Sequence, residues 1–194
     1  METGKLRISL IHYPVYVLGP GRRVVIWTQG CSIRCRGCIS KHTWSFEDGT
    51  VISIQELSEF LNKLPYDRLT ISGGEPFDQS EALLELLKKI RKYFSDILIY
   101  TGYKMEDIRE RFKEHLLLID ALVDGEFVEG WESPYAYKGS DNQRLFILNK
   151  NLFECYQEWS KLQERSLQVI EKDGKIYVVG IPFQKDAKRL NYGI

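Results

Sequence analysis

The chain has 194 residues, with 27 lysines and arginines against 27 aspartates and glutamates, so its formal net charge at pH 7 is zero. This balance excludes the overall basic field that nucleic-acid-binding proteins use. Hydrophobic residues make up 43% of the sequence and charged residues 28%, which is ordinary for a globular protein that buries a core. No apolar run approaches the roughly 20 residues of a membrane-spanning helix, and the first residues lack the apolar segment of a secretion signal. We therefore expect a soluble cytoplasmic protein.

The first part of the chain predicts strands and loops. Residues 5–18 combine β-forming residues with a proline, and we predict a lead-in segment with at most one short edge strand there. The reason is that Pro14 has no backbone N–H to donate to a sheet. Residues 24–28 are a continuous apolar run rich in β-branched residues, which is typical of a buried strand. Residues 44–50 are predicted to be a loop.

Strands and amphipathic helices alternate after this loop. Ser53 and Glu56 have the spacing of a capping box, which predicts a helix that ends before Pro65. The strands predicted after this helix cover 69–71, 97–101, 121–123 and 145–148, and the helices cover 78 or 80 to 90 and 105–112. Such alternation is typical of right-handed crossovers and a parallel sheet. Four or five units are too few for a closed eight-stranded barrel, so we predict an α/β fold with a partial, open barrel of mainly parallel strands.

The last quarter of the sequence has a different pattern. Residues 153–165 predict a helix. An Asp-Gly dipeptide between two alternating segments favours a β-hairpin over 167–179. Residues 185–194 are a polar tail that we expect to be loosely held. We therefore divide the chain into a main domain over 1–149 and a C-terminal helix and hairpin extension over 150–194.

Three of the four cysteines lie close together directly after the first buried strand, at positions 31, 35 and 38. Thiolates are soft ligands, and three of them on one short loop can hold three corners of a 4Fe–4S cluster. The fourth iron then has no protein ligand and is free to chelate and reduce a small molecule. A structural zinc site is the alternative, and His42 is available as its fourth ligand. Cys155 is distant in sequence and is more typical of a small core residue than of a ligand.

A second candidate segment, Gly73-Gly74-Glu75-Pro76, follows the predicted strand over 69–71. Glycines allow a ligand to approach the backbone, and the Glu75 carboxylate suits the ammonium group of a substrate. Taken alone, the segment is also compatible with a plain structural turn.

Four more polar residues are candidates by position. Thr101 and Asp124 end two predicted strands, at the edge of a parallel sheet where ligands bind, and strand-end capping is the alternative. Ser140 and Asn142 lie in a polar segment that suits a ligand, although the same segment is compatible with an ordinary turn.

Together, the cysteine loop and the Gly-Gly-Glu-Pro turn resemble the radical S-adenosylmethionine enzymes. The resemblance implies a 4Fe–4S cluster whose open iron chelates S-adenosylmethionine, and a turn that contacts the methionine amino group. One electron then cleaves the sulfonium and gives a 5′-deoxyadenosyl radical. The implied metal ligands and catalytic residues are Cys31, Cys35 and Cys38. The implied cofactor-binding residues are Gly73, Gly74 and Glu75, with Thr101, Asp124, Ser140 and Asn142 as further candidates.

Further motifs are similar to one branch of that family, the glycyl-radical enzyme activases that serve anaerobic ribonucleotide reductase. Gly37 fits this branch, because many other radical enzymes carry an aromatic residue before the third cysteine. The other matching segments are 13–15, 19–22, 30–31, 43–44, 100–103, 122–127 and 138–143.

The resemblance to this branch implies two partners. One is a glycyl-radical enzyme, anaerobic ribonucleotide reductase first of all, from whose glycine the radical takes hydrogen. The other is a flavodoxin- or ferredoxin-type electron donor. Residues 150–194 depart from the shortest members of the branch, so a small-molecule or peptide substrate is an alternative. A zinc-binding interaction module is the non-enzyme alternative.

Overall fold

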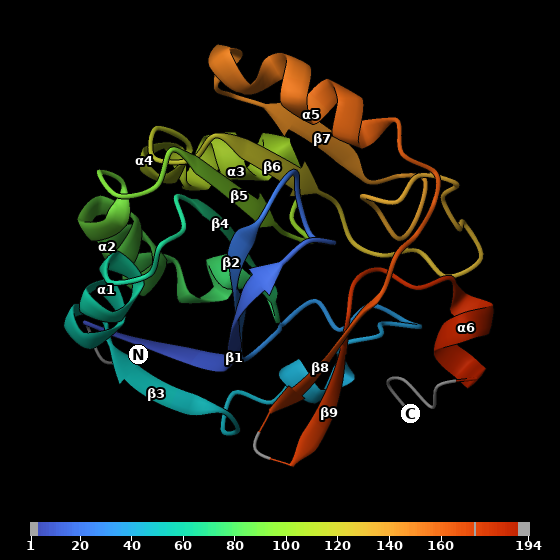
Figure 1. Cartoon of the computed structure of the whole chain (residues 1–194), viewed down its shortest axis with the longest axis horizontal. Coiled ribbons are helices and arrows are strands. Elements are labelled where there is room, and N and C mark those ends of the chain that lie inside the picture. The colour runs from blue at the N-terminus through green and yellow to red at the C-terminus, as the bar shows by residue number, and fades with distance from the viewer. Residues whose placement is uncertain (1–3, 173, 190–194) are drawn as a thin grey trace.

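The computed structural model describes residues 4–172 and 174–189, and its centre is a seven-stranded sheet (Figure 1). The strand order is β3-β1-β2-β4-β5-β6-β7. The strands are β1 (Lys5–Val15), β2 (Arg23–Thr28), β3 (Thr50–Ser53), β4 (Arg68–Gly73), β5 (Asp96–Tyr100), β6 (Ala121–Asp124) and β7 (Arg144–Ile147).

The centre of the sheet is parallel and its margins are antiparallel. Strands β2, β4, β5 and β6 pair in parallel, whereas β1 is antiparallel to β2 and β3, and β7 is antiparallel to β6. Within the described residues β3 and β7 are free edges, so the sheet does not close. The predicted α/β fold with parallel central strands is confirmed in this coarser form, and the barrel stays a prediction.

Helices cover the sheet and contribute much of the core. They are α1 (Ile54–Asn62), α2 (Ser80–Ile90), α3 (Met105–Arg111), α4 (Lys113–Leu116), α5 (Phe153–Ser160) and α6 (Gln184–Arg189). Three 3₁₀ turns lie at Lys41–Thr43, Pro76–Gln79 and Lys150–Leu152. None of the helices in the described ranges is long and apolar enough to cross a membrane.

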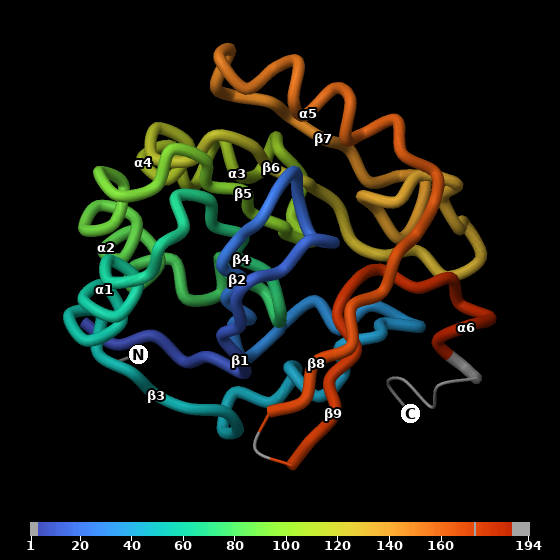
Figure 2. The backbone as a smooth tube through the Cα atoms, in the orientation of Figure 1, coloured from blue at the N-terminus to red at the C-terminus, as the bar shows by residue number. Residues whose placement is uncertain are grey.

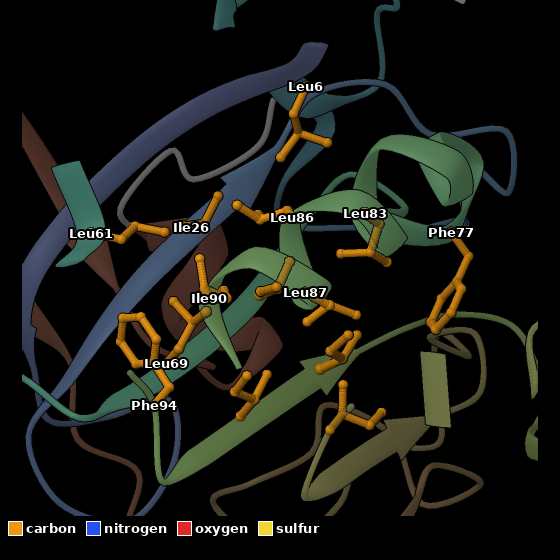
Figure 3. Packing of buried hydrophobic residues seen from close by; sticks show 14 of the residues in the cluster. Leu6, Ile26, Leu61, Leu69, Phe77, Leu83, Leu86, Leu87, Ile90 and Phe94 are labelled. Atoms are coloured by element: carbon orange, nitrogen blue, oxygen red, sulfur yellow. The ribbon is translucent and has the colours of Figure 1, made fainter. Parts of the chain in front are cut away.

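The predicted capping box is present at the start of α1. The Ser53 hydroxyl accepts a hydrogen bond from the Glu56 backbone N–H, and the Glu56 carboxylate accepts one from the Ser53 backbone N–H. The leucine face of α2 packs against β2 and β4, as the close-up in Figure 3 shows. The buried side chains of this layer include Ile26, Leu61, Leu69, Leu83, Leu86, Leu87 and Ile90.

The prediction for the N-terminal segment was wrong. Strand β1 is eleven residues long and lies inside the sheet, between β2 and β3. Pro14 is accommodated because the pairing of β1 with β2 is irregular between His12 and Val15, so that regular ladder hydrogen bonds are interrupted there. Strand β3 was not predicted, because its four residues gain their partner only from β1, more than 40 positions earlier.

More of the extension forms helices and strands than its sequence indicates. Strands β8 (Gln168–Lys172) and β9 (Lys175–Val179) form the predicted hairpin as a separate two-stranded sheet. The predicted helix over 153–165 is shorter and ends at Ser160 as α5. The predicted loose tail begins as helix α6, while residues 190–194 and the hairpin residue 173 lie outside the described residues.

A buried polar network joins α5 to the central sheet. Asp96 on β5 receives a hydrogen bond from Arg23 Nη1 at 2.8 Å and another from the Tyr156 hydroxyl at 2.6 Å. Arg23 and Tyr156 are fully buried. A buried ion pair is stable only when its remaining hydrogen-bonding groups are satisfied, and Tyr156 satisfies the second carboxylate oxygen. The helix of the extension is therefore part of the folded core.

We predict that Tyr156→Phe destabilises the protein by about 1–3 kcal/mol, because it leaves a buried carboxylate oxygen of Asp96 without that donor. Urea unfolding measures the difference in free energy of unfolding. Tyr93→Phe is the matched control, since Tyr93 is 38% exposed. Equal unfolding midpoints for the two variants would contradict the assigned role of Tyr156.

Candidate functional site

A cavity of about 740 Å³ lies beside the carboxyl ends of β2, β4 and β5. This is the edge where parallel α/β sheets build their binding sites. The predicted site residues that line it are Cys31, Cys35, Cys38, Gly73, Gly74, Glu75 and Thr101. The structure thus brings the cysteine loop and the Gly-Gly-Glu-Pro turn to one cavity.

The cysteine loop is held by hydrogen bonds of its own backbone. Gly30 N–H donates to the Thr43 carbonyl at 2.7 Å, and Cys31 N–H donates to the Trp44 carbonyl at 3.1 Å. The Gln29 side-chain amide donates to two more carbonyls of the returning segment, those of His42 and Ser45. These bonds join the start of the loop to the segment at its end, so the three thiols lie on a closed loop.

The Gly-Gly-Glu-Pro turn packs directly on this loop. Gly74 N–H donates to the Thr28 carbonyl at 2.8 Å, and Glu75 N–H donates to the Gly30 carbonyl at 2.9 Å. A Cβ atom on Gly74 would lie 2.1 Å from the Gly30 oxygen, and Gly73 has a φ of +107°. The two glycines are therefore required by a neighbouring backbone and by a left-handed conformation, in addition to any ligand.

Asp78 ties the two segments together a second time. Its carboxylate accepts hydrogen bonds from the Ser32 backbone N–H at 2.6 Å, the Ser32 hydroxyl at 2.9 Å and the Tyr103 hydroxyl at 2.8 Å. Ser32 directly follows the first cysteine. Sequence reasoning missed this contact, because Asp78 resembles an ordinary helix-start residue.

Glu75 is almost completely buried, and its carboxylate accepts three hydrogen bonds. Oε1 accepts from the Phe77 N–H at 3.0 Å and from the Thr101 hydroxyl at 2.8 Å, and Oε2 accepts from the Gly102 N–H at 2.8 Å. Burial raises the pKa of Glu75 to about 7, although these hydrogen bonds oppose the shift. Thr101 therefore positions the carboxylate.

Two of the three thiols, those of Cys31 and Cys35, occupy a setting that favours their neutral form. Burial raises the pKa of Cys35 to about 11, with smaller contributions from the neighbouring Cys38 and Cys31. Burial also raises the pKa of Cys31. Ionised thiolates at this place therefore need nearby positive charge, which iron ions supply when they bind.

The donor set fits an iron–sulfur cluster. Three soft ligands line one cavity, and Cys155 is not among its lining residues. Within residues 4–172 and 174–189, no group of three or more histidine, cysteine or acidic side chains is already gathered around one point that could hold a metal ion. His42, the fourth ligand of the alternative zinc site, lines the same cavity.

Asp124, Ser140 and Asn142 are not among the residues that line the cavity in the described part of the chain. The buried Asp124 carboxylate accepts hydrogen bonds from the Met105 N–H at 2.7 Å and from Arg144 Nε at 3.1 Å, so it caps the start of α3. The Ser140 hydroxyl accepts from the backbone N–H of residue 128, and the Asn142 amide donates to the carbonyl of residue 126. These contacts are structural, and the assignment of the three residues to the cofactor stays a prediction.

The polar segment that was a candidate by position does line the cavity, through Gly139 and Gln143 and not through Ser140 and Asn142. Sequence reasoning missed another part of the cavity wall. The C-terminal extension lines it with Tyr177, Ile181 and Gln184, among others. The alternation of a hairpin predicts which face is buried but not which element it covers, so no local signal identifies these residues.

The comparison with protein families defines the class. Residues 17–146 match the family described as a 4Fe-4S single cluster domain. The predicted 4Fe–4S cluster is thereby confirmed, and its three cysteine ligands stay a prediction. The extension lies beyond the matched range.

Similar curated proteins narrow the class further. The anaerobic ribonucleoside-triphosphate reductase-activating protein of enterobacteria phage T4 is 36% identical over 142 residues, which cover 69% of this chain and 90% of that protein. The protein of the same name from Haemophilus influenzae is 32% identical, and the match covers 69% of this chain and 94% of that protein. The one from Escherichia coli K12 is also 32% identical, and the match covers 68% of this chain and 93% of that protein. Among solved structures, QueE from Escherichia coli matches with 22% identity and a TM-score of 0.43 over 50% of this chain and 52% of that one. The chain belongs to the family of anaerobic ribonucleoside-triphosphate reductase-activating proteins.

The raised pKa of Glu75 predicts a pH dependence of stability. The pKa rises from its ordinary value of 4.5 to about 7 on folding, so the folded protein binds this proton more tightly than the unfolded chain. The resulting stabilisation is fully present below the unfolded value and is lost as pH rises through the folded value, by about 3 kcal/mol in total.

We therefore expect the free energy of unfolding of the cluster-free protein to fall as pH rises from 4.5 to about 7. This fall should be steeper than that of the Glu75→Gln variant. Urea unfolding at a series of pH values measures both slopes, and the comparison cancels groups that titrate equally in the two proteins. Parallel slopes would show that Glu75 titrates at its ordinary value.

Proposed function

We propose that this chain activates a glycyl-radical enzyme, anaerobic ribonucleoside-triphosphate reductase first of all, by reductive cleavage of S-adenosylmethionine. The proposal depends on one observation. The cysteine loop and the Gly-Gly-Glu-Pro turn are joined by backbone hydrogen bonds, and both line the same cavity. The names of the relatives add the kind of partner, an anaerobic ribonucleoside-triphosphate reductase.

Each part of the cavity has a proposed task. Cys31, Cys35 and Cys38 hold three irons of the 4Fe–4S cluster. When bound, the cluster supplies the electron that splits S-adenosylmethionine into methionine and a 5′-deoxyadenosyl radical, which takes a hydrogen atom from a glycine of the partner. Glu75 in its ionised form accepts the methionine ammonium group, and Thr101 holds that carboxylate in place.

The size of the cavity supports a macromolecular substrate. Its volume of about 740 Å³ falls within the range of sites for one small ligand, about 300–1,000 Å³. A cluster and S-adenosylmethionine fill most of such a space, so a segment of a partner protein that enters from outside fits better than a second large ligand. A small molecule or a peptide is the alternative substrate. The electron donor is of the flavodoxin or ferredoxin type.

We also propose that the sheet is the partial barrel of the radical S-adenosylmethionine enzymes. In this proposal residues 1–149 form the catalytic domain and residues 150–194 form an extension to it.

We predict that Cys35→Ala abolishes S-adenosylmethionine cleavage, because two thiolates do not hold the cluster with its open iron. The protein is reconstituted anaerobically with iron and sulfide and reduced with dithionite, and 5′-deoxyadenosine is measured by chromatography. Cys155→Ala is the matched control, since Cys155 is half-buried on α5 and does not line the cavity. Turnover retained by the Cys35 variant would remove the cluster from the mechanism.

The partner is tested separately by electron paramagnetic resonance. Incubation of the reduced protein with S-adenosylmethionine and an anaerobic ribonucleotide reductase is expected to give a glycyl radical signal on the reductase. Cleavage of S-adenosylmethionine without this signal would favour the alternative substrates.

A further inference from the structure

The C-terminal extension crosses the cavity that holds the three cysteines. The residues of this segment that line the cavity are Ile176, Tyr177, Val178, Val179, Gly180, Ile181, Pro182 and Gln184. Figure 2 shows the segment from β9 to α6 beside the chain that follows β2, which is the cysteine loop. The family match ends at residue 146, so this wall is an addition to the part of the site that the family defines.

The hairpin end of the segment is anchored on β1 and β2. The Gln168 side chain donates to the Pro14 carbonyl at 2.8 Å and accepts from the Tyr16 N–H at 3.2 Å. The buried apolar residues of this contact are Ile170 and Val179 from the hairpin and Val15, Leu18 and Val25 from the main sheet and its first turn. Both hydrogen bonds and burial therefore fix this end.

Arg165 anchors the other end. Its guanidinium donates to the Pro182 carbonyl at 2.9 Å, the Ser133 carbonyl at 2.6 Å and the Lys138 carbonyl at 2.9 Å. It also lies over the Phe183 ring, 4.3 Å from the ring centre. One side chain thus joins the segment before α6 to the loop that precedes β7.

Gln184 brings the segment to the cysteines. Its backbone N–H donates to Glu132 Oε1 at 2.6 Å. A Cβ atom on Gly37 would lie 3.2 Å from Gln184 Nε2 and equally close to side-chain atoms of Phe127 and Glu129. Gly37 lies between the second and third cysteines, so the Gln184 amide packs on the turn that presents two thiols.

We propose that residues 176–184 are a fixed wall of the cluster cavity that screens the cluster from solvent, and that Gln184 is a positioning residue for the turn between Cys35 and Cys38. The inference rests on the proposed function, because it assumes a bound cluster. Residues outside the ligand set contribute to the retention of a metal centre by holding the ligand-bearing backbone and by excluding water. The extension does both on one side of the cavity.

The test measures cluster retention in the full chain and does not require turnover. Wild type, Gln184→Ala and Arg165→Ala are reconstituted anaerobically and mixed with a ferrous-iron chelator, and iron release is followed with time. We expect both variants to lose iron roughly tenfold faster than wild type, the lower end of the range for outer contacts of metal sites. Lys175→Ala is the control, since Lys175 is exposed near the tip of the hairpin.

A second measurement separates loss of the wall from loss of the fold. Urea unfolding of the cluster-free variants shows whether Gln184→Ala keeps the wild-type stability while its cluster becomes labile, which is the result we expect. Equal rates of iron release from wild type and both variants, each with a normal cluster, would contradict the proposed role of residues 176–184. That result would not contradict the proposed function. A wild-type protein that binds no cluster would overturn both.

Discussion

The close approach between the cysteine loop and the Gly-Gly-Glu-Pro turn is the constraint on which the site depends. The turn donates two backbone hydrogen bonds to β2 and the start of the loop, and the approach leaves no room for a Cβ atom on Gly74. Since β2 and β4 are parallel neighbours, both segments leave the sheet at the same edge. The pairing of β2 with β4 therefore sets the position of the cysteine loop relative to Glu75. The hydrogen bonds that Ser32 donates to the Asp78 carboxylate join the two segments at a second place.

The site holds ionisable groups in buried or partly buried positions. Glu75 and two of the three thiols have pKa values raised by burial, so the cluster-free cavity favours neutral forms. In the proposed function, iron bound by the thiolates and an ammonium group bound by Glu75 would reverse that preference, because each supplies the positive charge that the ionised groups lack. Cofactor binding and deprotonation are therefore coupled in this cavity, and the protein itself provides the hydrogen bonds that orient Glu75.

The parts of the fold and site that were predicted from the sequence are those with local signals. The capping box of α1, the hairpin and the cysteine loop each depend on residues a few positions apart. The structure contains the capping box and the hairpin, and its three loop cysteines line one cavity. Strand β3 and the position of β1 inside the sheet depend on long-range pairing, which local propensity does not encode. Thr101 was placed at the cavity by its strand end, whereas Asp124 has the same sequence context and caps α3 instead. A strand end identifies the edge of the sheet but not the direction of the side chain.

The extension has the same dependence on distant contacts. Its helix contributes Tyr156 to the buried network around Asp96, and its hairpin covers apolar residues of β1 and β2. An appendage held in this way cannot leave without exposing the core to which it contributes. The wall over the cluster loop is therefore kept in place by contacts that stabilise the whole fold, and its closeness to Gly37 is a consequence of the core as much as of the site. The extension residues that line the cavity, which all lie within 176–184, are therefore held by the same core that positions the site.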